Sequence, residues 1–384
     1  MGYETYRIAD LIDEIAMGPF GSNIKVSCFV DSGVPVLNGS NLEGFSLSEK
    51  TFRYVTREKA DSLNKANAHR GDIVITHRGT LGQIVFIPQD SKYDRYVISQ
   101  SQFRVRCNDK VLPEYLVYYF HTPTGQHKLL SNASQVGVPA LARPSSTFQQ
   151  IEVVLPELSI QKRVVEIIST IQKKIVNNQE QNDNLLEQAS SIYQAWFEDF
   201  ILSDGSCPPS WKQGTLAGIA DITSGKRPPV KSAEKTDNAI IPIVGAASVM
   251  GYTTEANHTD KILVTGRVGT HGVVQRFNSP CWASDNTLVI TSAFYEYTFQ
   301  ILQRIDYRAM NRGSTQPLIT QGDMNKVPIL IPDNETLLKF ETLVGQLMKQ
   351  YQVNLLENDK LAELREALLP RLMSGELDVS DLDI

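Results

Sequence analysis

The sequence predicts an α+β protein made of two copies of one unit, each a β-rich block followed by a long helix. Three observations support this: two helical stretches share one heptad pattern, a strand ending in proline precedes each, and matching hairpin segments lie upstream. Internal repeats decide the fold before local propensity does. We therefore expect two globular blocks joined by two long antiparallel coiled-coil helices, with a pseudo-twofold relation between the halves.

The first helical stretch, residues 158–200, contains neither Pro nor Gly. Its inward-facing residues recur in alternating steps of four and three, which is the seam of a coiled coil. These seam residues are Val164, Ile168, Ile171, Ile175, Asn178, Asn182, Leu185, Ala189, Ile192 and Trp196. The two asparagines among them allow two interpretations: a wet break in the contact, or a polar layer that fixes register and partner.

The second helical stretch, residues 334–373, repeats the pattern and places asparagines at the same two seam positions. Its seam residues are Phe340, Val344, Leu347, Tyr351, Asn354, Asn358, Leu361, Arg365, Leu368 and Leu372. This recurrence favours the interpretation that the asparagines fix the register.

Short connections between the blocks and the helices require the two helices to run antiparallel. The alignment that pairs the polar layers opposes Asn178 with Asn358 and Asn182 with Asn354. Other pairs expected from this alignment are Trp196 with Phe340, Ile175 with Leu361, Leu185 with Tyr351 and, as a poor match, Ile171 with Arg365.

The blocks before the two helices also correspond, segment by segment. Each contains a β-branched run, a turn that reads Gly-Thr-x-Gly, a second β-branched run, further strands and one helical piece. The corresponding segments are 34–42 and 241–249, 72–87 and 261–277, 96–106 and 281–291, 113–121 and 297–311, and 151–156 and 327–332. We expect domains at 1–157 and 207–333, with spacer helices in 158–206 and 334–384.

Composition limits the class of protein. With 384 residues, of which 41% are hydrophobic, the chain is long enough for two or three globular domains. Its formal net charge is −6 and the acidic excess lies in the helical stretches, so nucleic acid could bind only to local basic patches of the blocks. Neither a secretory signal nor an apolar run of about 18 residues is visible, so we expect a cytoplasmic protein without membrane contact.

Signatures of catalysis and of metal binding are missing. The chain has no Walker-type phosphate loop, dinucleotide fingerprint, nucleophile elbow or zinc-protease motif. Its six His and four Cys are scattered without ligand spacing. We therefore expect no catalytic residue, no cofactor and no metal, although distant residues can assemble a site that spacing does not reveal.

Polar turns punctuated by glycine lie at matching places in both blocks. Their Arg, Asn, Gln, Asp, Ser and Thr side chains are the types that read base edges, while Lys, Arg and the N–H groups of Gly turns suit phosphates. The candidate DNA-binding residues are Ser22, Asn23, Lys25, Arg78, Thr80, Gln100, Ser101, Arg143, Lys226, Arg227, Arg267, Thr270, His271, Asp285, Asn286, Arg312, Ser314 and Gln316. The competing interpretation is that the Gly-Thr-x-Gly segments are only hairpin turns and that the basic residues are solvated surface charges.

Several segments together resemble one family. They are the proline-ended strand that leads to 161–168, the helix end 195–200, the Gly79–Gly82 turn and the C-terminal segment 368–377. In these segments and in its duplicated plan, the chain resembles the specificity subunits of type I restriction–modification systems over essentially its whole length. One departure is that the second helix begins with 335–339 and lacks the Gln-Lys-Arg of the first, which weakens the case that both ends engage a partner identically.

The resemblance implies a non-catalytic subunit in which two target-recognition domains each read one half of a bipartite, asymmetric site on double-stranded DNA. It also implies that the paired helices hold these domains apart and dock two methyltransferase subunits, and that the complex recruits ATP-dependent restriction subunits. A helix of about forty residues is roughly 60 Å long. Two domains on such a spacer could reach half-sites about one DNA turn, roughly 34–36 Å, apart.

Two other function classes stay open at this point. One is the recognition part of a split methyltransferase or restriction enzyme, for which binding of S-adenosylmethionine by the chain alone would speak. The other is a coiled-coil scaffold whose domains bind carbohydrate or protein instead of DNA. Sequence-dependent gel shifts in the presence of a methyltransferase partner would separate this scaffold from a DNA-recognition subunit.

Overall fold

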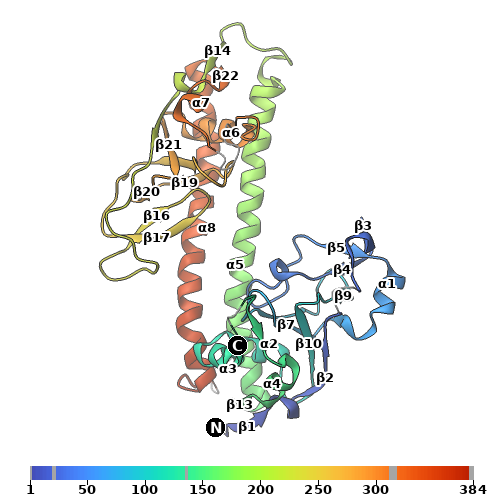
Figure 1. Cartoon of the computed structure of the whole chain (residues 1–384). Coiled ribbons are helices and arrows are strands. Elements are labelled where there is room, and N and C mark those ends of the chain that lie inside the picture. The colour runs from blue at the N-terminus through green and yellow to red at the C-terminus, as the bar shows by residue number, and fades with distance from the viewer. Residues whose placement is uncertain (1, 20–22, 135–136, 311–317, 380–384) are drawn as a thin grey trace. The chain divides into compact units, whose positions relative to one another are not determined.

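A computed structural model describes residues 2–19, 23–134, 137–310 and 318–379 (Figure 1). The chain forms two compact units, one of residues 1–176 with 357–384 and the other of residues 177–356. Each unit therefore contains one β-rich block and a half of each long helix, and each has its own hydrophobic core. Among the described residues, no helix is both long and apolar enough to cross a bilayer.

The first unit contains two larger β-sheets and a short two-stranded ladder, β1-β13, next to the long helices. A four-stranded antiparallel sheet has the order β2-β10-β7-β8, and a five-stranded sheet has the order β3-β5-β4-β9-β6, with β4 and β9 parallel. The strands are β1 (Glu4–Arg7), β2 (Ile12–Met17), β3 (Phe29–Val30), β4 (Val34–Val36), β5 (Arg53–Val55), β6 (Asn67–His69), β7 (Ile73–Thr76), β8 (Ile84–Phe86), β9 (Arg95–Val97), β10 (Gln102–Cys107), β11 (Ala133–Ser134), β12 (Ala140–Leu141) and β13 (Glu152–Leu155). The strand β1 pairs with β13, just before the first long helix.

Four short α-helices lie among the described residues of the first block. They are α1 (Arg57–Ser62), α2 (Pro113–His121), α3 (Pro123–Leu130) and α4 (Pro144–Gln150). Residues of α2 are almost entirely buried, and Tyr115 and Phe120 are fully enclosed in the core beside Phe103 of β10. The observed bounds of α2 coincide with the predicted helical piece 113–121, so that prediction is confirmed.

The second unit repeats this plan, with fewer strands among its described residues. Its four-stranded sheet has the order β15-β21-β18-β19, and a three-stranded sheet, β17-β16-β20, contains one parallel pair, as its counterpart does. The strands are β14 (Lys212–Thr215), β15 (Ala220–Ser224), β16 (Ile241–Val244), β17 (Val249–Thr253), β18 (Ile262–Gly266), β19 (Gln275–Phe277), β20 (Trp282–Ala283), β21 (Thr287–Ser292) and β22 (Pro328–Ile331). The helices are α6 (Tyr295–Arg304) and α7 (Gln321–Asn325). The predicted α+β fold with an internal repeat is confirmed.

The predicted helical piece 297–311 was too long. Helix α6 ends at Arg304, because Ile305 adopts an extended backbone (φ −69°, ψ 132°) that does not continue a helix. The Arg304 guanidinium lies 4.2 Å from the centroid of the Tyr193 ring, and its Nε donates to Glu198 at 2.9 Å.

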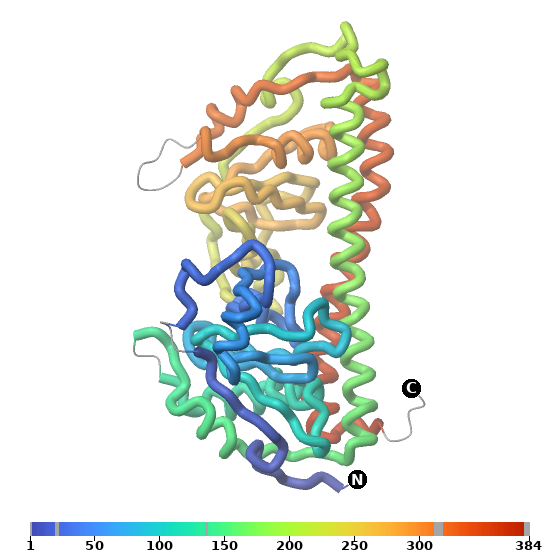
Figure 2. Tube along the Cα trace, turned by 90° about the vertical axis from the view of Figure 1, so that its right-hand side faces the viewer, coloured from blue at the N-terminus to red at the C-terminus, as the bar shows by residue number. Residues whose placement is uncertain are grey.

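The two long helices are α5 (Leu158–Tyr193) and α8 (Asn334–Ser374). In the first unit, the start of α5 lies beside the end of α8 (Figure 2), with Lys174 Nζ 3.1 Å from a Glu357 carboxylate oxygen and Arg365 Nη1 2.9 Å from Gln172 Oε1. The partner of a later residue on α5 is an earlier residue on α8, so these halves run antiparallel.

In the second unit, the remaining halves of α5 and α8 also pair antiparallel. The Asn354 Nδ2 donates to Asn182 Oδ1 at 2.9 Å, and the Trp196 and Phe340 rings lie with centroids 5.9 Å apart. Both are the pairs that follow from aligning the two asparagine layers. Asn182 and Asn354 are almost fully buried, so the Asn354 Nδ2 and the Asn182 Oδ1 satisfy each other in place of water.

The predicted central helix does not continue to residue 206. Regular α-helix ends at Tyr193 and is followed by a π turn, Gln194–Glu198, and by a left-handed Phe200 with φ 52°. The π turn places Trp196 and Phe197 in an aromatic cluster, in which Phe197 contacts Tyr193, Trp211, Tyr297 and Phe340. At this end of α5, aromatic packing therefore takes the place of a further turn of regular α-helix.

The two long helices begin with different anchors. At the start of α5, the buried Gln161 accepts from the Leu112 N–H at 3.0 Å and donates to the Pro156 carbonyl at 3.0 Å, while Arg163 donates to the Val379 carbonyl at 2.9 Å. These contacts give the Gln-Lys-Arg motif an intramolecular role. At the start of α8, the position that corresponds to Gln161 is the buried Leu337.

Candidate nucleic-acid interface

Four segments of the first block meet at the end of the four-stranded sheet through main-chain hydrogen bonds. The Gly18 N–H donates to the Gln102 carbonyl at 2.8 Å, and the His77 N–H donates to the Ser101 carbonyl at 2.9 Å. The Leu141 N–H in turn donates to the His77 carbonyl at 2.9 Å. These bonds, which we call the turn frame, hold together four of the polar turns that the sequence singles out.

The second block builds the same turn frame from equivalent residues. The Gly225 N–H donates to the Thr287 carbonyl at 3.1 Å, and the Arg267 N–H donates to the Asn286 carbonyl at 2.8 Å. The Ile319 N–H donates to the Arg267 carbonyl at 3.0 Å. Each bond of the first frame therefore has its counterpart in the second.

Glycine is required at one position of each frame. A Cβ on Gly18 would lie 1.9 Å from the Ser99 carbonyl oxygen, and one on Gly225 would lie 2.0 Å from the Ser284 carbonyl oxygen. Both approaches are to backbone, which cannot give way, so any side chain there would force the turn out of the frame. The glycines of the Gly-Thr-x-Gly turns have a different reason, since Gly79 has φ 93° and Gly269 has φ 84°.

Those Gly-Thr-x-Gly segments connect paired antiparallel strands in both blocks. They follow β7 and β18, which pair with β8 and β19 respectively. The prediction of hairpin turns is therefore confirmed. It does not exclude a second role for the side chains that these turns carry.

A cleft of about 610 Å³ lies beside the turn frame of the first block. Its lining includes Asn23, Arg78 and Gln100, three of the predicted DNA-binding residues, together with Lys65 and His77. The polar turns at 18–25, 77–80 and 99–101 thus contribute to one concave surface. Burial lowers the pKa of His77 and the neighbouring Arg78 acts in the same direction, so the imidazole is neutral at pH 7.

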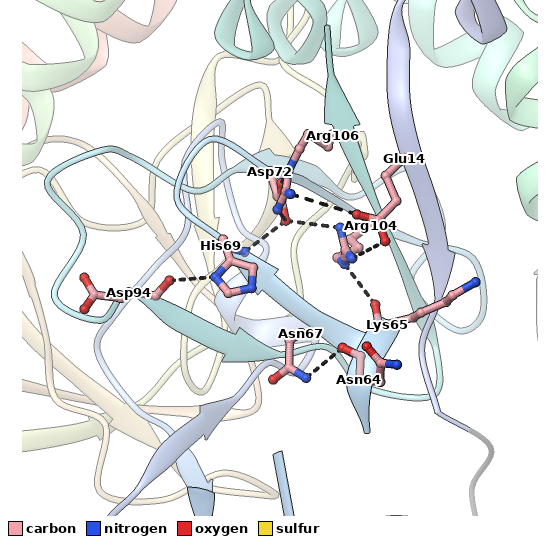
Figure 3. A network of polar contacts seen from close by, with 9 residues as sticks. All are labelled: Glu14, Asn64, Lys65, Asn67, His69, Asp72, Asp94, Arg104 and Arg106. Atoms are coloured by element: carbon pink, nitrogen blue, oxygen red, sulfur yellow. Dashed lines mark hydrogen bonds and ion pairs between the residues drawn. The ribbon is translucent and has the colours of Figure 1, made fainter. Parts of the chain in front are cut away.

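A buried ion-pair network supports the wall of this cleft (Figure 3). The Arg104 guanidinium, with only 5% of its side chain exposed, contacts Glu14 at 2.7 Å and the fully buried Asp72 at 3.4 Å. Its Nε donates to the Lys65 carbonyl at 2.9 Å. Arg106 completes the charge balance through its Nε, 2.8 Å from Asp72. The network therefore fixes the backbone of Lys65, a residue of the cleft lining.

The turn frame of the second block carries a different set of side chains. The Lys226 N–H donates to the Ala283 carbonyl at 2.9 Å, and its carbonyl accepts from Trp282 Nε1 at 2.7 Å, which orients the exposed Lys226 and the adjacent Arg227. Asp285 and Asn286 are exposed on the neighbouring turn. His271 turns back on its own turn, because its Nδ1 lies 3.0 Å from the Gly266 carbonyl oxygen.

Models of the type I restriction modification DNA specificity domain match residues 2–188 and 208–366, so both halves of the repeat are covered. The chain belongs to the type I restriction–modification specificity subunits. This membership confirms that the chain is a non-catalytic subunit whose role is recognition of a DNA target.

Two relatives illustrate how far sequences diverge within this family. The chain is 23% identical to the type I restriction enzyme MjaIX specificity subunit of Methanocaldococcus jannaschii, over 99% of this chain and 94% of the relative. It is 20% identical to the HindI specificity subunit of Haemophilus influenzae, over 80% of this chain and 87% of the relative. Among solved structures, the S subunit from M. genitalium has a TM-score of 0.59 at 15% identity, with 97% of this chain and 96% of that chain covered.

In this specificity subunit, most of the predicted DNA-binding residues that the structure describes are exposed. Those exposed are Asn23, Lys25, Arg78, Thr80, Gln100, Arg143, Lys226, Arg227, Thr270, Asp285 and Asn286, while Ser101, Arg267 and His271 are half-buried. Ser22, Arg312, Ser314 and Gln316 lie outside the described residues. Within the described ranges, His, Cys, Asp and Glu side chains form no group of three suited to a metal ion.

The sequence did not single out Lys65 and Trp282, which line or orient the turn surfaces, and it placed His77 in a polar turn without making it a DNA-binding candidate. Lys65 is contributed by the short helical turn Asn64–Ala66, whose neighbours in the fold come from strands far away in sequence. Trp282 is not one of the polar residue types that the sequence pattern selects. Its indole N–H donates to the Lys226 carbonyl, 56 positions away in the chain.

Proposed function

We propose that this specificity subunit recognises a bipartite, asymmetric target on double-stranded DNA, with each block reading one half. The observation that carries the proposal is that one turn frame is built twice and carries different side chains. His77, Arg78 and Gln100 in the first block correspond to Arg267, Val268 and Asp285 in the second. Because these side chains have different donor and acceptor patterns, the half-sites should differ in sequence.

The residues proposed to contact DNA lie on the turn surfaces of the two blocks. In the first block they are Asn23, Lys25, Arg78, Thr80, Gln100, Ser101 and Arg143, joined by Lys65; in the second they are Lys226, Arg227, Arg267, Thr270, His271, Asp285 and Asn286. Lysines and Gly-turn N–H groups are assigned to phosphates, which give affinity and register. Arginine, amide and carboxylate side chains are assigned to base edges, which give specificity.

The partners proposed for this subunit are two methyltransferase subunits, which dock on the long helices, and restriction subunits, which join through the complex. Exposed apolar residues on the outer face of α8 support a docking role. Leu338, Val353 and Leu356 are 59%, 54% and 52% exposed. Contiguous exposed apolar surface marks interaction sites, and Val353 and Leu356 lie about one helical turn apart on α8.

Methylome sequencing of cells with and without this chain tests the proposed function. Deletion should abolish methylation at one bipartite motif, and re-expression of the wild-type chain should restore that motif. An unchanged methylome, in cells whose methyltransferase partner is expressed, would contradict the proposal.

A second experiment tests the spacer role of the helices. Insertion of one heptad into each long helix beside the asparagine layer keeps the seam in register and lengthens the spacer by about 10 Å, or roughly three base pairs. The gap between the methylated half-sites should then grow while the bases read stay the same. If the original gap is retained, the helices do not set the spacing.

A further inference from the structure

The arginines of the two turn frames do not occupy the same position. In the first block, Arg78 forms an antiparallel bridge with Ala140, and His77 bonds to Leu141. Successive residues of an extended chain point to opposite faces. Arg78 and His77 therefore project from opposite faces of the paired segments 77–78 and 140–141, which we call the first rung.

In the second block, Val268 bridges Leu318 in the same way, and Arg267 bonds to Ile319. Arg78 thus corresponds to Val268, and Arg267 corresponds to His77. Arg78 and Arg267 both belong to polar turns at matching places in the sequence. They nevertheless project from opposite faces of the first rung and of its counterpart in the second block, the paired segments 267–268 and 318–319.

Burial identifies which face is turned to solvent. Leu141 is 8% exposed and Ile319 is fully buried, and the His77 ring lies 6.4 Å from the ring of the core residue Phe103. The face of His77 and Arg267, both half-buried, is therefore the less exposed of the two. The opposite face carries the exposed Arg78, which lines the cleft together with Asn23, Gln100 and the half-buried His77.

Resting on the proposed function, we propose that Arg78 is a specificity-determining residue that reads a guanine in the half-site of the first block. Its backbone is fixed on both sides, by the His77 carbonyl bond to Leu141 and by the Gly79 N–H bond to Pro139 at 2.9 Å. No carboxylate of the described residues pairs with its guanidinium. The guanidinium of an exposed arginine on a fixed backbone presents a planar fork of donors that matches the O6 and N7 acceptors of guanine, which lysine cannot match with two parallel bonds.

Val268 has no donor, so the corresponding position of the second half-site lacks an arginine contact. The asymmetry of the target at this position then follows from the position of the arginine, which stands one residue earlier in the second block than in the first on equivalently paired segments. This assignment also separates Arg78 from the exposed lysines, whose mobile ammonium groups suit phosphates and carry no base information.

The test is selection from a library of duplexes with randomised half-sites, using the specificity subunit in complex with its methyltransferase partner. The wild-type complex should select one bipartite consensus. R78V and R78K should both lose about ten- to hundredfold discrimination at one guanine of one half-site and leave the other half-site unchanged. R78K is decisive, because lysine keeps the charge that a phosphate contact needs.

R7T is the matched control, because Arg7 is 60% exposed, pairs with the exposed Glu152 and lies on β1, away from the turn frame. It should select the wild-type consensus, and all variants should melt at the wild-type temperature, since both arginines are on the surface. If wild-type selects no consensus, the proposed function fails. If wild-type selects one but R78K also selects it unchanged, or R78V weakens binding equally on all sequences, Arg78 is not a specificity determinant.

Discussion

The two blocks share one turn frame but stabilise the strands beneath it by different means. In the first block, β10 carries Arg104, which is held by Asp72 and Glu14. In the second block, the strand pairing places Val289 at the position of Arg104 and Ile262 at that of Asp72, and both are buried. A buried ionic cluster and an apolar contact thus support the same arrangement of four strands.

The turn frame therefore does not depend on the chemistry of the layer below it. The second block contains its own buried pair, in which Arg276 contacts Glu296 at 2.7 Å, but this pair joins β19 to α6 and does not lie beneath the frame. Buried ion pairs are weak indicators of net stability, whereas breaking one by removing a single partner is costly. Substitutions that give one block the buried residues of the other can therefore show whether the turn frame depends on the layer of side chains beneath it.

The largest effect is expected from R104V, which gives the first block the residue of the second. Removal of the guanidinium leaves Asp72 and Glu14 with Arg106 alone, and the first unit should lose about 3–5 kcal/mol of stability. Hydrogen exchange of β2, β7 and β10 reports this loss. All three tryptophans, Trp196, Trp211 and Trp282, lie in residues 177–356, so their fluorescence unfolding curve gives an internal control that should not move.

The double variant D72I/R104V sharpens the same comparison. It removes both charges and installs the apolar pair that the second block uses, so it should recover a large part of the lost stability. Exchange rates of β10 that are as fast in the double variant as in R104V would show that the ionic cluster is not interchangeable with the apolar pair.

A pH-dependent difference between the units is expected from Glu341 on α8. Burial raises its pKa to about 7, although its carboxylate accepts from the Glu296 and Tyr297 N–H groups at 3.0 and 2.8 Å. The position that corresponds to Glu341 on α5 is Val165, so the first unit has no such group.

Because the pKa of Glu341 is raised on folding, the folded second unit binds a proton more tightly than the unfolded chain does. Its stabilising contribution is therefore complete below about pH 4.5 and is lost as the pH rises to about 7, by up to about 3 kcal/mol. Tryptophan-monitored denaturation across this range should show the decline, and E341Q should flatten it. An equal slope in E341Q would assign the pH dependence to another group.

The smallest effect is expected from Q161L, which gives α5 the residue that begins α8 at this position. Loss of the Gln161 amide leaves the Leu112 N–H and the Pro156 carbonyl without a partner in a buried place, which should cost about 2 kcal/mol. Hydrogen exchange at the start of α2 is the readout. L337I, a conservative change at the matching position of α8, is the control. It should leave hydrogen exchange at the start of α2 unchanged, because Leu337 lies in the other unit.

Periodicity and repetition were sufficient to predict much of the fold. The two heptad seams gave the long helices, and the shared asparagines gave the pair Asn182 and Asn354 that is hydrogen-bonded in the second unit. Recurrence of polar turns located both turn frames, because turn residues leave local composition signals that strand partners do not. The poor match expected at Arg365 arises because its guanidinium serves Gln172 and lies 4.9 Å from the Phe45 ring centroid.

Other features depend on contacts that no local pattern contains. The Arg104 network joins residues 90 and 32 positions apart, and its members look like ordinary surface charges in the sequence. The end of α5 at Tyr193 reflects aromatic packing against Trp211 and Tyr297, not helix propensity. The register of Arg78 against Ala140 needed the bridge itself, because pairing between strands decides which side chain faces the cleft.

The turn frame also determines which sequences can evolve at this surface. Its bonds join main-chain N–H groups to main-chain carbonyls, so at His77, Arg267 or Leu141 every residue type except proline can supply the required donor. Mutational drift at the exposed positions of these turns, such as Arg78 and Asp285, is thus almost free of a folding penalty, while Gly18 and Gly225 are fixed by contact with backbone. The exposed turns of the two blocks can therefore change independently of each other. Each change in one block gives a new half-site, and new combinations of half-sites follow.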